Sequence, residues 1–140
     1  MTPFGERLRR IRAERNLALG DLAAQIGVSS AYLSALEHGH RGKPNRRLVH
    51  SICQALGIIW DEAEDLQRLA DLSHPKVPLD TAGLTPDATL LANLLSRDIA
   101  TLPPETIAEM LEVLRRERGR PAMTKSGGSR RGKVGRPPSV

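Results

Sequence analysis

Apolar residues recur every three or four positions along most of this chain, and they nowhere alternate with polar residues as in a strand. This spacing predicts amphipathic helices, each with one apolar face to bury. The core must consist of Leu, Ile, Val and Ala, because Phe4, Tyr32 and Trp60 are the only aromatic residues. The 140 residues suffice for one small domain with appendages, or for two very small domains. The sequence therefore predicts an all-α protein.

Five helices are expected in the first half of the chain, over residues 4–15, 19–26, 30–37, 46–56 and 60–72. Asn16 and Gly27 can adopt the left-handed conformation that ends a helix, and Gly57 should stop the fourth helix in the same way. Ser29 can cap the third helix. The first turn of the fifth helix is acidic, which suits a helix N-terminus. Residues 1–72 therefore form the first predicted domain.

The second half of the chain begins with a linker, because residues 73–84 (SHPKVPLDTAGL) are rich in Pro and Gly. Thr85 as N-cap and Pro86 at the first helical position then start a helix, and PPET starts another. Residues 85–118 are expected to form a helical hairpin for dimerisation or interaction. The remaining residues lack periodicity and contain mostly Gly, Pro, Ser and basic side chains, which predicts a disordered basic tail over 119–140.

Charge divides the chain into three segments. Residues 1–58 contain 9 Lys/Arg against 4 Asp/Glu, residues 59–114 contain 3 against 11, and residues 115–140 contain 9 against 1. Basic segments suggest a polyanion partner, which the acidic middle would repel. The alternative is a solvated surface with scattered charge.

The stretch LGDLAAQIGVSSAYLSALEHG resembles the helix-turn-helix of the Xre/Cro family, the lambda-repressor-like fold, and the resemblance extends over roughly residues 4–58. The residues at the family's spacing have physical reasons to be there. Ala23 is small where the two helices cross, Gly27 makes the turn, and Val28 and Leu33 fill the gap between the helices. The other matching positions are Leu22, Tyr32, Ser34, Leu36 and Glu37. The resemblance implies a five-helix DNA-binding domain.

Three further expectations follow from this resemblance. Arg12 should pair with Glu37 and hold the first helix against the reading unit. Ala18 stands where the family usually has Ser or Thr, and Leu19 where it usually has Gln, so a helix cap and a phosphate contact are weakened. Gly20 lowers the helix propensity nearby. We therefore expect weaker DNA binding than in typical relatives.

The reading helix of a helix-turn-helix approaches base edges in the major groove with the residues near its N-terminus. Here none of them can form a bidentate Arg–guanine or Gln–adenine pair, so direct readout should be modest. The residues predicted to contact DNA in this helix are Ser29, Ser30, Ala31, Tyr32, Ser34 and Ala35. Contacts to phosphates fix the register without conveying sequence. They are expected from Arg41, Lys43, Arg46 and Arg47.

The basic tail contains ERGRP at residues 117–121 and GRPP at residues 135–138, which are similar to a minor-groove-binding AT-hook. A Gly-flanked arginine can lie in the narrow minor groove of A·T tracts. Arg118, Arg120 and Arg136 are therefore candidate DNA contacts. The alternatives are a tail that attracts phosphates generally, one that only solubilises the protein, and one that folds against the acidic residues 59–72 and competes with DNA.

The predicted hairpin has two apolar stripes, which its two short helices cannot both cover by facing each other. A second copy of the chain is expected to complete this core in a homodimer. The alternative is that the hairpin packs on the DNA-binding domain. The predicted dimerisation residues are Leu90, Leu91, Leu94, Leu95, Ile99, Ile107, Met110, Leu111 and Leu114.

Other chemistry finds little support in the sequence. Cys53 falls at core spacing and is expected to be a buried small hydrophobe, and no set of four converging zinc ligands is evident among the histidines. Nucleophile elbows, Gly-rich phosphate loops and paired carboxylates are absent. We expect neither a metal, nor a cofactor, nor enzyme activity.

The cellular location is expected to be the cytoplasm, in association with the nucleoid. A single cysteine excludes an internal disulfide and fits a reducing compartment. The N-terminal residues lack the apolar stretch of a signal peptide. No apolar run approaches the roughly 20 residues needed to span a bilayer, so no membrane contact is expected.

The expected function is that of a sequence-specific transcriptional regulator, a homodimeric repressor that occludes a promoter on double-stranded DNA. Two half-sites about one helical turn apart would supply the surface that a single reading helix lacks. Two alternatives remain open. One is an antitoxin or antiactivator that binds a protein partner through the C-terminal helices. The other is an architectural DNA-binding protein, suggested by the weak reading helix and the basic tail.

Overall fold

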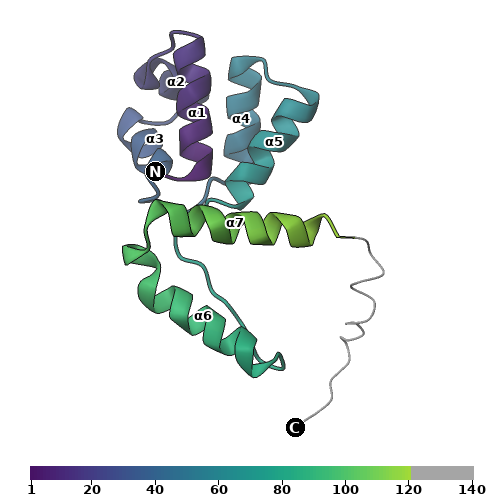
Figure 1. Cartoon of the computed structure of the whole chain (residues 1–140). Helices are drawn as coiled ribbons and strands as arrows, with labels where there is room; N and C mark the ends of the chain where they lie inside the picture. Colours follow the sequence, from purple (N-terminus) through teal and green to yellow (C-terminus); the bar gives the residue numbers. More distant parts are fainter. Residues whose placement is uncertain (121–140) are drawn as a thin grey trace. The chain divides into compact units, whose positions relative to one another are not determined.

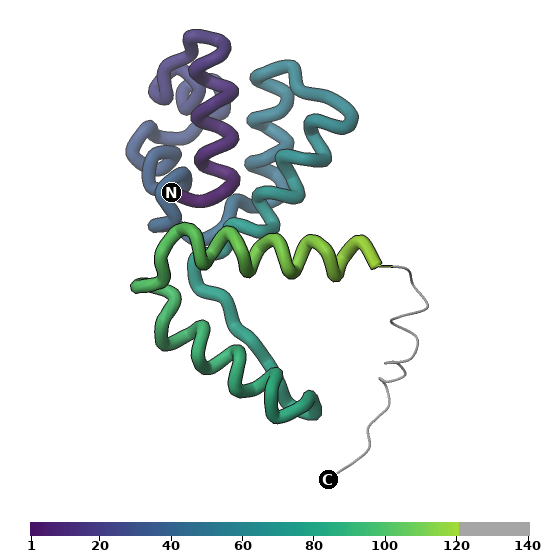
Figure 2. The backbone as a smooth tube through the Cα atoms, in the orientation of Figure 1, coloured from purple at the N-terminus to yellow at the C-terminus, as the bar shows by residue number. Residues whose placement is uncertain are grey.

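The computed structural model describes residues 1–120, and these residues form seven α-helices and one 3-10 turn (Figures 1 and 2). No strand occurs among them, so the all-α prediction is confirmed. The chain divides into one unit over residues 1–78 and a second that begins at Leu79. The elements are α1 (Pro3–Glu14), α2 (Leu19–Ile26), α3 (Ser30–Glu37), α4 (Arg46–Leu56), α5 (Trp60–Asp71), α6 (Pro86–Asp98), η1 (Ile99–Thr101) and α7 (Pro104–Arg118).

Local capping explains the helix ends of the first unit. Helices α2, α3 and α4 begin and end where the sequence predicts. The Ser29 hydroxyl caps α3 by accepting a hydrogen bond from the Tyr32 amide, and Gly27 and Gly57 end α2 and α4 with φ of 78° and 69°. At the start of α2, Ala18 offers no side-chain cap, as the sequence suggests. Side-chain caps therefore hold α3 but not α2.

The core of the first unit lies between its five helices. Helix α1 is central, in contact with α3 and α5, while α2 packs on α3 and α4, and α4 packs on α5 (Figure 1). The fully buried side chains come from all five helices, which makes this core complete within one chain. The largest of them are Phe4, Leu8, Leu22, Leu33, Leu36, Ile52 and Leu66.

The N-terminus of α1 is anchored at two places. The Thr2 amide donates to the Glu37 carbonyl at 3.1 Å, and the Phe4 amide donates to the Ser73 hydroxyl at 2.9 Å. Glycine is required at position 5, because a Cβ there would collide with the main chain of Glu37. These contacts fix α1 against the end of α3 and against the residues that follow α5.

The second unit contains α6, η1 and α7. The Thr85 hydroxyl accepts a hydrogen bond from the Ala88 amide at 3.2 Å, and Pro86 occupies the first turn, as predicted. The helix ends at Asp98 and continues as η1 to Thr101. The helical run stops there because Leu102 precedes Pro103 and is extended, as the α conformation is disfavoured before proline. Helices α6 and α7 then diverge (Figure 2), and no residue of either is buried.

Two remaining expectations can be located in this structure. From residue 121 onward, the predicted tail lies outside the described residues. Among residues 1–120, no helix combines the length and the apolarity that a bilayer crossing requires.

Candidate nucleic-acid interface

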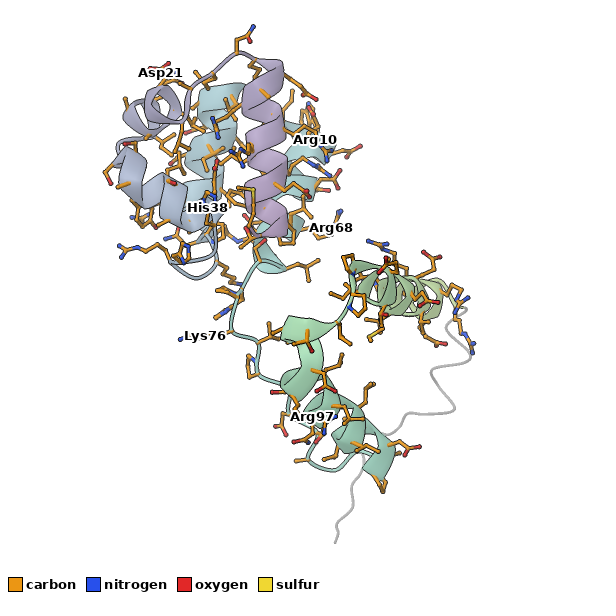
Figure 3. The ribbon with its side chains drawn as sticks, turned by 60° about the vertical axis from the view of Figure 1, so that its left-hand side comes forward. Arg10, Asp21, His38, Arg68, Lys76 and Arg97 are labelled. Carbon is orange, nitrogen blue, oxygen red and sulfur yellow. The ribbon has the colours of Figure 1, made fainter. Side chains whose placement is uncertain are left out.

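The pair of helices α2 and α3 is held rigidly by the turn between them and by the core beneath them. After Gly27 the Val28 amide donates to the Ala23 carbonyl at 3.0 Å. Ala23 is 1% exposed and Leu33 is fully buried, so the two helices pack closely where they cross. Asp21 and His38 lie at opposite ends of this helix pair (Figure 3). This packing therefore holds α3 in a defined orientation.

The accessible face of α3 carries short side chains, except for Tyr32, which is half-buried. Ser29, Ser30 and Ala31 are exposed, while Ser34 and Ala35 are half-buried. Short side chains allow the helix backbone to approach a groove closely, but they offer few donors and acceptors for reading bases. This face can thus sit deep in a groove while reading few bases directly.

Arg41 and Lys43, two of the predicted phosphate-binding cations, have partners in the structure. The Arg41 guanidinium lies 5.2 Å from the centre of the Tyr32 ring, a cation–π contact that holds it beside α3. Lys43 Nζ lies 3.7 Å from Asp71 Oδ1, with both side chains about half exposed. If Lys43 binds a phosphate as predicted, it must first release this carboxylate, so its net gain on binding DNA should be smaller than that of Arg41.

The other two predicted cations, Arg46 and Arg47, are exposed in the first turn of α4. The turn is fixed by Asn45, whose side chain accepts a hydrogen bond from the Leu48 amide at 2.8 Å. Cations thus follow α3 directly in the chain, as the prediction requires. Their contact with DNA stays a prediction.

Two histidines close the C-terminal end of α3. His38 Nδ1 lies 2.9 Å from the Ser34 carbonyl oxygen, and the rings of His38 and His40 stack with centroids 6.4 Å apart. In the described part of the chain, no three metal-ligating side chains come together. His38 is the C-cap residue of α3, and His40 stacks on it just after the helix.

Arg12 and Glu37 form an ion pair that joins α1 to the end of α3. Arg12 Nε lies 3.4 Å from Glu37 Oε2, and Arg12 Nη1 donates to the Leu17 carbonyl at 3.3 Å. Arg12 Nη2 also donates a hydrogen bond to Glu37 Oε1 at 3.5 Å, while Nε and Oε2 have no hydrogen-bond partner. Glu37 is 2% exposed, which makes its charge costly without the arginine.

Most of the predicted dimerisation residues are exposed in the second unit. Their exposed fractions range from 39% at Leu94 to 62% at Leu114. Leu95, Ile107 and Met110 are half-buried. Sequence reasoning missed Val113, which is 47% exposed and could have been found from its spacing of three residues after Met110. The exposed members of the predicted set are Leu90, Leu91, Leu94, Ile99, Leu111 and Leu114.

The candidate minor-groove arginines are only partly within the described residues. Arg118 is the last residue of α7, and Arg120 Nε lies 3.1 Å from Glu117 Oε2 in an exposed ion pair. Arg136 lies outside the described residues. An extended contact through Arg118 would require the last turn of α7 to open.

A groove between α4 and α5 was not anticipated from the sequence. Its volume is about 1290 Å³, and its lining includes Cys53, whose pKa is raised by burial. Ile59 and Trp60 also line it and are 62% and 80% exposed. Residues 58–60 are three large apolar residues in a row, and this run is the sequence signal that could have revealed the groove. Only Ile58 of the three is buried, so the other two remain at the surface.

The fold and the accessible face of α3 define a helix-turn-helix protein. The family model described as a helix-turn-helix domain matches residues 3–66, from α1 into α5. Among curated proteins, the HTH-type transcriptional regulator DdrOP3 of Deinococcus deserti is 37% identical over 98 residues, which cover 69% of this chain and 75% of DdrOP3. The chain belongs to the family of helix-turn-helix-type transcriptional regulators, as the resemblance to the Xre/Cro family predicts.

Two similar proteins come from Bacillus subtilis. The HTH-type transcriptional repressor RghR is 41% identical over 61 residues, which cover 44% of this chain and 45% of RghR. The uncharacterized HTH-type transcriptional regulator RghRB is 36% identical over 61 residues, which cover 44% of each chain. The match thus spans less than half the length of these two relatives. No solved structure matches the chain significantly.

Proposed function

We propose that the protein binds double-stranded DNA as a homodimer through α3 and represses transcription by occluding a promoter. The observation that supports this most is the accessible N-terminal face of α3, with four cations directly after it in the chain. A helix presented in this way fits the major groove, and the cations suit the flanking phosphates. The name of RghR, a transcriptional repressor, supports repression.

Sequence preference is expected to come mainly from DNA shape and from the spacing of half-sites. Ser30 and Ser34 can donate to or accept from several bases, and Ala31 and Ala35 can contact the methyl group of thymine. These contacts discriminate weakly, so two copies reading half-sites about one helical turn apart add specificity that one copy lacks. The open apolar faces of α6 and α7 support dimerisation.

Selection of bound sequences from a random DNA pool tests this function. The wild type should enrich a pseudo-palindromic site with half-sites about one helical turn apart. The Ser30→Ala/Ser34→Ala variant should enrich a different or less defined half-site, because it removes the hydroxyl groups that could contact bases and keeps the helix propensity of α3. A matched variant, Ser96→Ala on α6, should enrich the wild-type site. Bound DNA without any preferred sequence would contradict the proposal and favour an architectural protein.

The salt dependence of affinity for the selected site separates phosphate contacts from base contacts. Arg41→Ala should reduce the slope of log affinity against log salt concentration by about 0.9, the contribution of one phosphate contact on duplex DNA. Lys43→Ala should reduce this slope less, because Lys43 must break its ion pair with Asp71 to bind a phosphate. Arg97→Ala, an exposed cation of the second unit (Figure 3), is the control. An unchanged slope in the Arg41 variant would mean that DNA binds another face.

A further inference from the structure

Helices α4 and α5 lie side by side in the first unit (Figure 1), and a groove runs along both of them. Its lining extends from Arg46 in the first turn of α4 to Asp71 at the end of α5. At about 1290 Å³ it exceeds the roughly 300–1,000 Å³ of a typical small-molecule pocket. The 11 residues of α4 give it a length of about 16 Å. A groove of this shape suits an elongated ligand.

The two ends of the groove differ in chemistry. Only three residues join α4 to α5, so the helices are antiparallel. The ion pair between Lys43 and Asp71 accordingly places the start of α4 beside the end of α5. Arg46 and Arg47 therefore lie at one end of the groove, and the apolar run 58–60 lies at the other.

The end of the groove that contains Arg46 and Arg47 is cationic. Both residues are exposed, and neither forms an ion pair within the described part of the chain. Over its whole length the groove is lined by three arginines against two carboxylates, Glu64 and Asp71, and Asp71 is already paired with Lys43. Two neighbouring arginines without a counter-charge favour an anion, which accepts charge-assisted hydrogen bonds from their guanidinium groups.

The opposite end of the groove exposes apolar side chains. Trp60 is one of only three aromatic residues in the chain, yet it is 80% exposed. Its φ of 55° lies in the left-handed region that bulky residues rarely occupy, and such conformations cluster at functional sites. Val49 and Cys53, both buried, continue the apolar surface along α4 towards Arg46. This surface suits a hydrocarbon chain, which gains free energy by leaving water.

We propose that this groove binds an anionic amphiphile, with its head on Arg46 and Arg47 and its single hydrocarbon chain extending to Ile59 and Trp60. One such molecule meets the chemistry of both ends and follows the length of the groove. The same two arginines are predicted phosphate contacts, so the bound head competes with DNA. This consequence rests on the proposed function, whereas the site itself does not.

The fluorescence of Trp60, the only tryptophan, tests the site without DNA. Dodecanoate, added to the full-length protein below the concentration at which it forms micelles, should shift the emission to shorter wavelength and protect the indole from acrylamide. Octanoate should bind about tenfold more weakly, because fewer methylene groups leave water. Dodecyltrimethylammonium, which has the same chain and the opposite charge, should also bind about tenfold more weakly. Equal affinities for the two heads would overturn the proposal.

Paired variants locate the head of the ligand. Arg46→Gln/Arg47→Gln should raise the Kd of dodecanoate about tenfold, because two charge-assisted contacts are lost. Arg9→Gln/Arg10→Gln removes two exposed cations of α1 that do not line the groove, and it should leave the Kd unchanged. The same Kd in both variants would mean that the amphiphile binds only adventitiously. An emission that shifts when the protein is diluted without ligand would mean that a second copy covers the groove, and this too would refute the proposal.

Competition with DNA separates the site from the proposed function. Saturating dodecanoate should weaken binding of the wild type to the selected DNA about tenfold, because the head withdraws two arginines from phosphates. The affinity of the Arg46→Gln/Arg47→Gln variant for this DNA should not respond to dodecanoate. If dodecanoate binds the wild type with the expected dependence on the arginines but leaves its DNA affinity unchanged, the groove stands as a site, and the competition and the phosphate contacts of Arg46 and Arg47 are wrong.

Discussion

The two units use the same kind of side chain, leucine at helical spacing, in opposite ways. In the first unit, leucines of all five helices are buried together, and the core is complete. In the second unit, Leu90, Leu91 and Leu114 are each more than half exposed, and no residue from 79 to 120 is buried. Chains shorter than about 40 residues rarely enclose a core without help from a metal, a disulfide or another copy. The described part of the second unit, residues 79–120, is close to that limit.

The largest expected effect concerns the cores of the two units. Leu33→Ala should lower the unfolding free energy of the first unit by about 2–5 kcal/mol, because it leaves a cavity among fully buried neighbours. Leu90→Ala should leave the stability of that unit unchanged. Hydrogen exchange of the α4 amides measures both. If Leu90→Ala accelerates exchange in α4 as much as Leu33→Ala, the two units do not fold separately.

Replacing apolar residues of the second unit by charges should act on assembly. Leu94→Asp/Leu111→Asp should yield monomers, and affinity for a two-half-site DNA should fall about 100-fold, because the second half-site is no longer bound at high effective concentration. Val77→Asp/Leu79→Asp adds the same charge at exposed linker positions and serves as the control. Gel-shift titration gives the affinities. Undiminished binding by the α6–α7 variant would show that dimerisation is not needed.

Helix ends and the main ion pair could be predicted from the sequence because they depend on local or family-wide patterns. Ser29, Gly27 and Gly57 act within a few residues of their own positions. The pairing of Arg12 with Glu37 follows from the resemblance to the Xre/Cro family.

Contacts between distant residues could not be predicted in this way. The ion pair between Lys43 and Asp71 and the divergence of α6 and α7 depend on how helices pack, which periodicity does not determine. The left-handed conformation of Trp60 has no sequence signal comparable to glycine. The residues assigned to DNA binding and to dimerisation stay predictions.

A buried ion pair in the first unit should contribute more to the unfolding free energy than an exposed ion pair in the second unit. Arg12→Met should destabilise the first unit by about 3 kcal/mol, because Glu37 is then buried without its counter-charge. Arg97→Met should have no measurable effect. Arg97 lowers the pKa of Asp98 by a hydrogen bond, but both groups are exposed and water screens their attraction. Urea unfolding followed by circular dichroism compares the two variants, and equal losses would contradict this difference.

The smallest expected effect concerns the helix caps. Ala18→Ser should stabilise the first unit by about 1 kcal/mol, because Ala18 already has the extended conformation of an N-cap but no side-chain acceptor. At the start of α6, Thr85 already provides this cap. Thermal unfolding measures the gain, with Ala13→Ser, an exposed position inside α1, as the control. A stabilisation no larger than that of the control would mean that α2 begins differently.

We propose that a second copy of the chain covers the open apolar faces of α6 and α7. Sedimentation equilibrium of the full-length wild type at micromolar concentration, without DNA, measures this assembly. We expect a mass of twice the 15.3 kDa of one chain, and the mass of one chain for Leu94→Asp/Leu111→Asp. A wild type that sediments with the mass of a single chain throughout the micromolar range would rule out this dimer.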